Sequence, residues 1–137
     1  MSNHILIVDD DPAILRTLSA GLRSRGYSVE TAANGEEALR LADRRTVPID
    51  LVISDLVMPE MNGVQLFVRL GQWFPEARFL FISGYVENPD AHLADGTRTA
   101  FLPKPFTLSQ LVGAGRSLLD QTRRRVTQPR MRVFAAR

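Results

Sequence analysis

Near its amino terminus the chain reads Ile5-Leu6-Ile7-Val8-Asp9-Asp10-Asp11, four aliphatic residues followed directly by three aspartates. A short apolar run that stops at charged residues is typical of a strand buried on both faces of a sheet. Three later runs stop in a similar way, close to Asp55, Ser83 and Lys104. Ligand sites in open parallel sheets form at the carboxyl ends of the strands, so we expect carboxylates, a hydroxyl and an ammonium at one edge. These groups together indicate a site for a cation and a phosphoryl group.

Helical periodicity separates the apolar runs. The spacing predicts helices over residues 12–25, 34–45, 64–74 and 107–119, with helix-capping residues at Asp11, Asn34 and Thr107. Between residues 85 and 99 the pattern weakens, which indicates a short or loosely held fourth helix. Five strands alternating with five helices predict an α/β fold, a doubly wound, five-stranded parallel sheet in the flavodoxin-like order 2-1-3-4-5. Residues 27–31 alternate in polarity, as an edge strand does.

Composition divides the chain into two regions. Its 137 residues carry a formal charge of +2, but residues 123–137 hold six arginines and no acid; subtracting six leaves −4 for residues 1–122. We therefore expect one domain over residues 1–122 and a basic, Arg-rich tail or linker over residues 123–137. An acidic domain is a poor nucleic-acid surface, so any such contact is expected only through the tail, which otherwise is a solvated extension.

Two further features of the composition bear on where the protein acts. The chain has no cysteine, which suits a reducing compartment. It also has no apolar run approaching the roughly 20 residues that cross a bilayer. We therefore expect a cytoplasmic protein that is not inserted in a membrane.

Four motifs near the strand ends resemble the receiver domain of bacterial response regulators. They are Ile-Val-Asp-Asp-Asp-Pro (7–12), Ser-Asp-Leu-Val-Met-Pro-Glu-Met-Asn-Gly (54–63), Phe-Ile-Ser-Gly-Tyr (81–85) and Phe-Leu-Pro-Lys-Pro-Phe (101–106). The resemblance extends over residues 3–119. One motif alone would be weak, but four in this order are specific. The resemblance implies a phosphoacceptor module of a two-component phosphorelay.

The resemblance also implies roles for the acidic residues. Asp55 would be the phosphoacceptor, taking a phosphoryl group from a phosphohistidine on a sensor histidine kinase or a phosphotransfer protein. Asp10, Asp55 and the backbone carbonyl of Val57 would bind Mg²⁺, and Asp9 would hold the ion through a water. This agrees with the chemistry of the residues, because three gathered carboxylates repel one another unless a hard divalent cation lies among them. Asp11 is not among the expected ligands of the ion, because we expect its side chain to cap the following helix.

Three more residues receive roles from the resemblance. Lys104 would pair with Asp55 before the reaction and with the phosphoryl group after it. Ser83 would donate a hydrogen bond to a phosphoryl oxygen, and Phe101 would turn from an exposed to a buried position. This switch would change partner binding through the fourth helix, the fifth strand and the fifth helix. The resemblance also implies a cis peptide bond between Lys104 and Pro105.

The residues leave several alternatives open. Asp9 and Asp10 could be a solvated loop and cap, Ser83 a turn hydroxyl, Lys104 a surface charge and Phe101 a core aromatic. At the level of function, the chain could be a receiver cut from a hybrid histidine kinase or a multidomain regulator, or a phosphorelay shuttle, and a homodimer stays open. A Mg²⁺-dependent phosphatase is less favoured, because the sequence offers no separate general acid near Asp55 and no obvious substrate cap. We therefore expect a signalling module that catalyses only its own phosphotransfer and autodephosphorylation.

Overall fold

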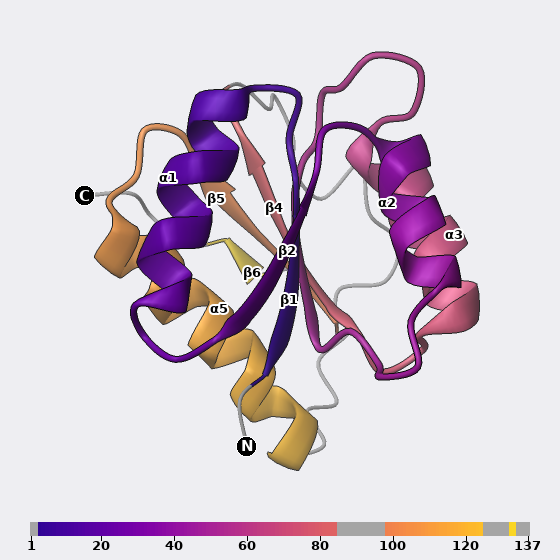
Figure 1. Ribbon diagram of the computed structural model, residues 1–137. Coiled ribbons are helices and arrows are strands. Elements are labelled where there is room, and N and C mark those ends of the chain that lie inside the picture. Colours follow the sequence, from indigo (N-terminus) through magenta and orange to yellow (C-terminus); the bar gives the residue numbers. More distant parts are fainter. Residues whose placement is uncertain (1–2, 85–97, 125–131, 134–137) are drawn as a thin grey trace.

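The computed structural model describes residues 3–84, 98–124 and 132–133. The strands among them form one parallel sheet (Figure 1). Its strands lie in the order β2-β1-β3-β4-β5-β6. The first five strands confirm the predicted order, whereas β6 at the edge was not predicted. The strand bounds are β1 His4–Val8, β2 Ser28–Ala32, β3 Leu51–Asp55, β4 Arg78–Ser83, β5 Thr99–Pro103 and β6 Arg132–Val133.

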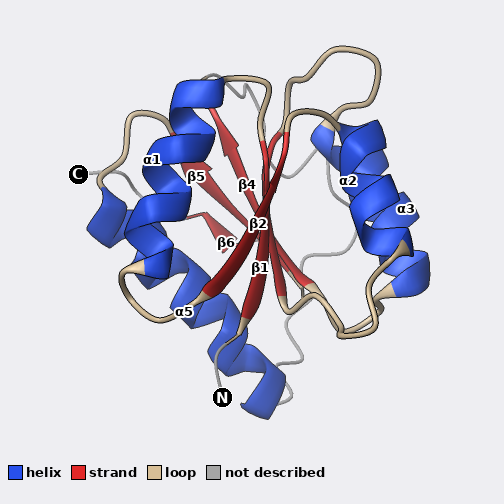
Figure 2. Ribbon diagram, viewed as in Figure 1, coloured by secondary structure: helices blue, strands red, loops and turns tan. Residues whose placement is uncertain are grey.

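Helices cover both faces of the sheet (Figure 2). On one face lie α1 (Pro12–Arg23) and α5 (Leu108–Arg124), and on the other lie α2 (Gly35–Asp43) and α3 (Gly63–Trp73). This confirms the doubly wound architecture. The weak helix predicted between residues 85 and 99 falls almost wholly outside the described residues. Among the helices of the described part, none is long and apolar enough to cross a membrane.

Side-chain caps start the helices. Asp11 Oδ1 accepts a hydrogen bond from Ala13 N at 2.9 Å, which confirms the predicted cap of α1. Asn34 caps α2 as predicted by accepting from Glu37 N at 2.8 Å. The predicted pairing of Thr107 with Gln110 at the start of α5 is also present, in both directions. Asn62 and Gln65 form an equivalent box at α3 that was not predicted. These caps begin α1, α2 and α3 soon after the strands β1, β2 and β3 end.

Alternate residues of each strand enter two separate cores. The aliphatic face, under α1 and α5, is built from isoleucine, leucine, valine and alanine side chains and includes Leu80 and Leu102. The aromatic face, under α2 and α3, contains four buried phenylalanines: Phe67, Phe79, Phe81 and Phe101. The ring of Phe67 meets those of Phe79 and Phe81 edge-on, with centroids 5.0 and 6.1 Å apart. The sheet therefore separates two layers of different chemistry.

Candidate functional site

Asp55 is the last residue of the central strand β3. It pairs in register with Ile82 of β4, and its exposed fraction is only 8%. One carboxylate oxygen, Oδ1, accepts a hydrogen bond from the backbone N–H of Val57 at 3.1 Å. The strand end therefore fixes the carboxylate at the edge of the sheet with one oxygen held by the following loop. The Val57 side chain is 69% exposed, so it lies at the surface beside this carboxylate.

Lys104 follows β5 and reaches back to the end of β3. Its backbone N–H donates to the carbonyl of Ser83 at 2.8 Å, which fixes the start of the side chain beside β4. Its Nζ lies 3.3 Å from Oδ2 of Asp55 and 3.5 Å from Oδ2 of Asp9. The expected cis bond between Lys104 and Pro105 is present. One ammonium thus lies between two buried carboxylates that come from different strands.

Asp9 and Asp10 complete an acidic cluster with Asp55. One carboxylate oxygen from each of the three lies within 4.8 Å of the others. Asp10 is exposed, whereas Asp9 is 1% exposed. Oδ1 of Asp9 accepts a hydrogen bond from the backbone N–H of Asp11 at 2.9 Å. Oδ2 of Asp9 is buried and accepts no hydrogen bond. The positive charge beside it is the Lys104 ammonium, at 3.5 Å.

The electrostatics of this cluster are unbalanced. Burial raises the pKa of Asp9, and the neighbouring carboxylates of Asp55 and Asp10 add to the rise. The hydrogen bond from Asp11 and the charge of Lys104 oppose it without cancelling it. The cluster has three carboxylates and one ammonium, so negative charge is in excess around Oδ2 of Asp9, the buried oxygen that accepts no hydrogen bond. Hard divalent cations prefer this kind of all-oxygen donor set, so the residues present fit such an ion.

Ser83 lies on β4, the strand next to that of Asp55, and Phe101 lies on β5, one strand further out. Ser83 ends β4, one residue after the register partner of Asp55, and is 3% exposed. Phe101 lies on β5, is 3% exposed and belongs to the aromatic face. The structure therefore brings Ser83 to the same edge of the sheet as the acids. It places Phe101 in the buried one of the two positions that the resemblance implies.

Gly63 is a positioning residue whose importance only the structure reveals. A Cβ atom at this position would lie 2.6 Å from the backbone oxygen of Asp55 and 3.1 Å from the Cα of Leu56. The Gly63 N–H donates to the Leu56 carbonyl at 3.0 Å, so the start of α3 packs directly on the end of β3. Any side chain here would push on the backbone that carries the acidic cluster. The motif in the sequence indicates a loop at this glycine but not this contact.

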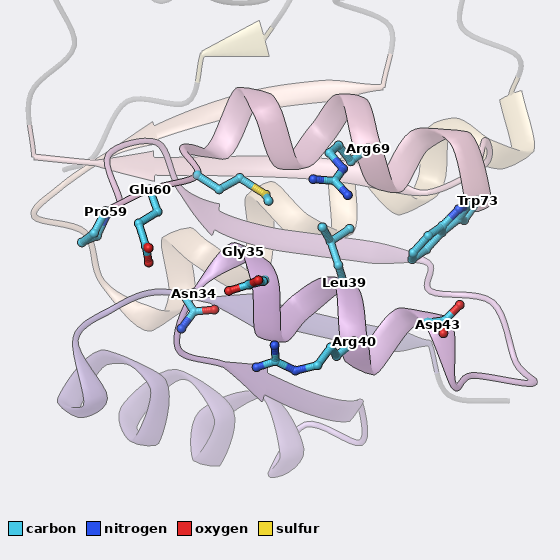
Figure 3. A pocket seen from close by; sticks show the side chains of 11 residues that line it. Asn34, Gly35, Leu39, Arg40, Asp43, Pro59, Glu60, Arg69 and Trp73 are labelled. Carbon is cyan, nitrogen blue, oxygen red and sulfur yellow. The ribbon is translucent and has the colours of Figure 1, made fainter.

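A groove of about 720 Å³ lies apart from the acidic cluster, between α2 and α3 (Figure 3). Leu39 and Arg40 line it from α2, and Arg69 and Trp73 line it from α3. None of the acidic cluster residues borders this groove. The candidate functional site is therefore not identified by the size of a cavity. It is identified by the opposite charges that lie together at the strand ends.

Comparison with known proteins agrees with this geometry. The family model for the response regulator receiver domain matches residues 5–116. The chain is 40% identical over 121 residues to the sensor kinase CckA of Brucella abortus and 42% identical over 120 residues to the transcriptional regulatory protein GlrR of Escherichia coli. These alignments cover 88% and 87% of the chain but only 13% and 27% of those relatives. The chain thus spans a small part of each.

A solved structure shares the fold as well. The CheY-like response regulator receiver domain protein of Methanospirillum hungatei superposes with a TM-score of 0.81 at 27% identity, covering 92% of this chain and all of that one. Family, relatives and fold agree with the acidic edge found in the structure. The chain belongs to the response regulator receiver domain family, the phosphoacceptor modules of two-component signalling.

Proposed function

We propose that Asp55 accepts the phosphoryl group, from a phosphohistidine on a sensor histidine kinase or a phosphotransfer protein. The observation that carries this proposal is the 3.3 Å separation between the Lys104 Nζ and the Asp55 carboxylate, beside the cluster with Asp9 and Asp10. Asp55 is held at the end of a buried strand, so its carboxylate is positioned for attack at low entropic cost. Both oxygens of Asp55 accept hydrogen bonds, Oδ1 from the backbone N–H of Val57 and Oδ2 from the Lys104 ammonium, whereas Oδ2 of Asp9 lies 3.5 Å from that ammonium and accepts none.

The proposed reaction is an in-line displacement at phosphorus. An oxygen of Asp55 forms a bond to phosphorus while the bond from phosphorus to the histidine nitrogen of the donor breaks, and the histidine leaves as the neutral ring or takes up a proton from water. Transferring a phosphoryl group spreads negative charge over three equatorial oxygens. Lys104 lies between Asp55 and Asp9, and in this proposal its ammonium pairs with that charge. Catalysis then consists mainly of positioning and electrostatic stabilisation.

We assign Mg²⁺ binding to Asp10, Asp55 and the backbone carbonyl of Val57, with Asp9 acting through a water. When bound, the ion would neutralise the carboxylates and the incoming phosphoryl oxygens. The support is chemical: the cluster has more carboxylates than cations, and Oδ2 of Asp9 is buried without a hydrogen bond. A carboxylate with that oxygen facing the cluster is suited to accept from a water that the ion orders.

We assign the response to phosphorylation to Ser83 and Phe101. The Ser83 hydroxyl would donate to a phosphoryl oxygen on Asp55, and Phe101 would be held in its buried position. Both residues lie on strands that continue from the acidic edge into the aromatic face. The change would alter the surface around β5 and α5 and so the affinity for a partner, by shifting a population rather than by turning over a substrate.

For the whole protein we propose a cytoplasmic signalling protein with a receiver over residues 1–122 and a basic tail over residues 123–137. The relatives that this chain resembles include both a sensor kinase and a transcriptional regulatory protein, so either setting is compatible with the chain. We favour a response regulator over a hybrid kinase as the setting. We also propose that it does not act as an enzyme on an external substrate. Steady turnover of small phosphoesters in the presence of Mg²⁺ would contradict this.

The test is phosphorylation of the Asp55→Asn variant with a small phosphodonor and Mg²⁺, followed by intact mass. Asp43→Asn serves as the control, since Asp43 is exposed at the end of α2, outside the acidic cluster. The control should gain one phosphoryl group as the unaltered chain does, and Asp55→Asn should gain none. Undiminished labelling of Asp55→Asn, or a label that survives hydroxylamine, would overturn the proposal.

A further inference from the structure

The outer edge of β5 carries a strand from the chain's own tail. Residues Ala100 and Phe101 pair with Arg132 and Val133 of β6 in parallel register. In Figure 1, β6 is the short yellow arrow beside β5, beyond the five strands of the predicted sheet. An edge strand exposes a row of unpaired N–H and C=O groups, which is a template for another extended chain. The tail segment takes up part of that row.

The backbone groups that face β6 can be identified from those that face β4. The Arg98 carbonyl accepts from Phe79 N, and Lys104 N donates to the Ser83 carbonyl, each at 2.8 Å. Even-numbered residues of β5 therefore direct their backbone groups to β4. Because successive residues of a strand point to opposite sides, Phe101 directs its N–H and C=O to the outer edge. This is the residue that pairs in register with Val133.

The register also identifies the residue of β6 that faces β5. In a parallel pair, the backbone groups of one residue bond to the two neighbours of its register partner. The partner of Phe101 is Val133, so Arg132 is one of those neighbours. The N–H of Val133 then points away from β5. Further along the same edge, Pro103 has no N–H to donate, which leaves the Phe101 backbone as a principal contact of the edge.

The connection makes docking within one molecule the natural arrangement. α5 ends at Arg124 and β6 begins at Arg132, so residues 125–131 join them. β6 runs parallel to β5, so β5, α5 and β6 form another strand-helix-strand unit of the kind that builds the rest of the sheet. Tethering to α5 also gives the segment a high effective concentration at the edge.

We propose that the β5 edge is a docking surface for an extended peptide, and that the segment containing Arg132 and Val133 occupies it in the same molecule. Main-chain hydrogen bonds supply the affinity in strand addition, so the fitting partner is an extended segment in parallel orientation. While docked, the tail shields the Phe101 backbone from strands of other chains. This proposal is independent of the role assigned to Asp55, and the two can fail separately.

Amide hydrogen exchange of the full chain, followed by NMR, tests the docking. Arg132→Pro removes an N–H that faces β5, whereas Arg132→Thr removes the charge and keeps the N–H. We expect Arg132→Pro to accelerate exchange at the Phe101 amide by about tenfold or more, and Arg132→Thr to have little effect. The amides of Ala100 and Leu102 face β4 and should not change. Fast exchange of Phe101 in the unaltered chain, or equal loss of protection at all three amides, would overturn the proposal.

Two additions sharpen the test. Val133→Pro removes an N–H that points away from β5, so Phe101 should stay protected; acceleration by Val133→Pro alone would overturn the register. A synthetic peptide of residues 129–137 added to the Arg132→Pro protein should slow exchange at Phe101 again. The same peptide carrying R132P should not. Equal protection by both peptides, or none by either, would overturn the claim that this edge accepts an extended segment.

Discussion

The two faces of the sheet are built from alternate residues of the same strands, yet they differ in chemistry and in their relation to the site. The aliphatic face is packed with branched side chains between α1 and α5. The aromatic face carries four phenylalanines and the loop that follows Asp55, through Leu56 and Met58. A Cβ at Gly63 would touch both the Asp55 carbonyl and the ring of Phe81. The aromatic face therefore packs directly on the backbone of Asp55, and we expect a change at Asp55 to reach this layer before it reaches the aliphatic face.

Leu80 and Phe81 give the most direct test of the difference between the two faces. They are neighbours on β4, both are fully buried, and they point to opposite faces. Leu80→Ala and Phe81→Ala should each lower the free energy of unfolding by about 2–5 kcal/mol through the cavity left behind. Urea unfolding followed by the fluorescence of Trp73, the sole tryptophan, measures both. Val68→Ala, at a 56% exposed position, is the control and should cost less than about 0.5 kcal/mol.

The same two variants also distinguish an effect on stability from an effect on the phosphorylation of Asp55. When the phosphorylation rate is corrected for the folded fraction, Phe81→Ala should be slower than the unaltered chain and Leu80→Ala should match it. Equal rates for the two variants would show that the faces are equivalent in their effect on Asp55.

Gly63→Ala tests the contact that joins the aromatic face to Asp55. The added methyl would meet the Asp55 carbonyl at 2.6 Å, so we expect a loss of about 1–3 kcal/mol in stability and slower phosphorylation. Gly113→Ala on α5 is the matched control, because nothing lies within 4 Å of its Cβ position. That change should instead stabilise the helix by about 0.5–1 kcal/mol. Similar effects at both glycines would remove Gly63 from its positioning role.

Asp9→Asn tests the acidic edge through pH. Burial raises the pKa of Asp9 above its ordinary value of 3.8 in the folded state. Below pH 3.8 both states are protonated and the carboxyl costs little; as the pH rises through the folded-state pKa, the unaltered chain loses stability. Without metal, Asp9→Asn should therefore be the more stable protein at neutral pH, with an advantage that shrinks in acid. Urea unfolding across this pH range measures it.

Adding Mg²⁺ gives the complementary measurement for Asp9. The ion should stabilise the unaltered chain more than Asp9→Asn, which has one carboxylate fewer to balance. An advantage of Asp9→Asn that stays constant with pH would exclude the carboxyl as its cause.

Glu60→Gly gives the smallest expected effect, in the loop that enters the aromatic layer. Glu60 has a φ of 69°, and Met61 N donates to the Pro59 carbonyl at 2.7 Å across it. Glycine adopts this conformation without the steric cost, so the substitution should raise stability by about 1 kcal/mol. Glu76→Gly, at an exposed position without a positive φ, should lower it slightly. A loss at both positions would mean that Glu60 makes a compensating contact.

Much of the fold was predictable because buried strands that end in charged residues have a strong local pattern. The sheet order follows from that pattern, and the caps at Asp11, Asn34 and Thr107 follow from short polar residues placed just before a helical apolar period. β6 was not predictable, since two residues have no periodicity and pair only because β5 presents a free edge. The cap of α3 at Asn62 was not predicted, because Asn62 lies between the loop breakers Pro59 and Gly63, which favour a continuous loop over a helix start.

The site was predictable in its residues but not in its electrostatics. Strand ends placed Asp55 and Lys104 at one edge, and the structure brings them within 3.3 Å. Asp9 and Asp10 are identical neighbours in sequence, yet one is buried and the other exposed, because the chain turns between them from strand to helix. The orphaned oxygen of Asp9 and its raised pKa depend on that turn.

Lys104 and Asp55 are separated by 49 residues along the chain, and they meet only because β4 lies between β3 and β5. A nascent or misfolded polypeptide has the same aspartate but no ammonium beside it. The donor kinase would then find a competent acceptor only on molecules whose sheet is complete through β5. Under the proposed function, the amount of phosphorylated protein therefore depends on the number of correctly folded molecules. Misfolded molecules are not phosphorylated, and no separate mechanism is needed to exclude them.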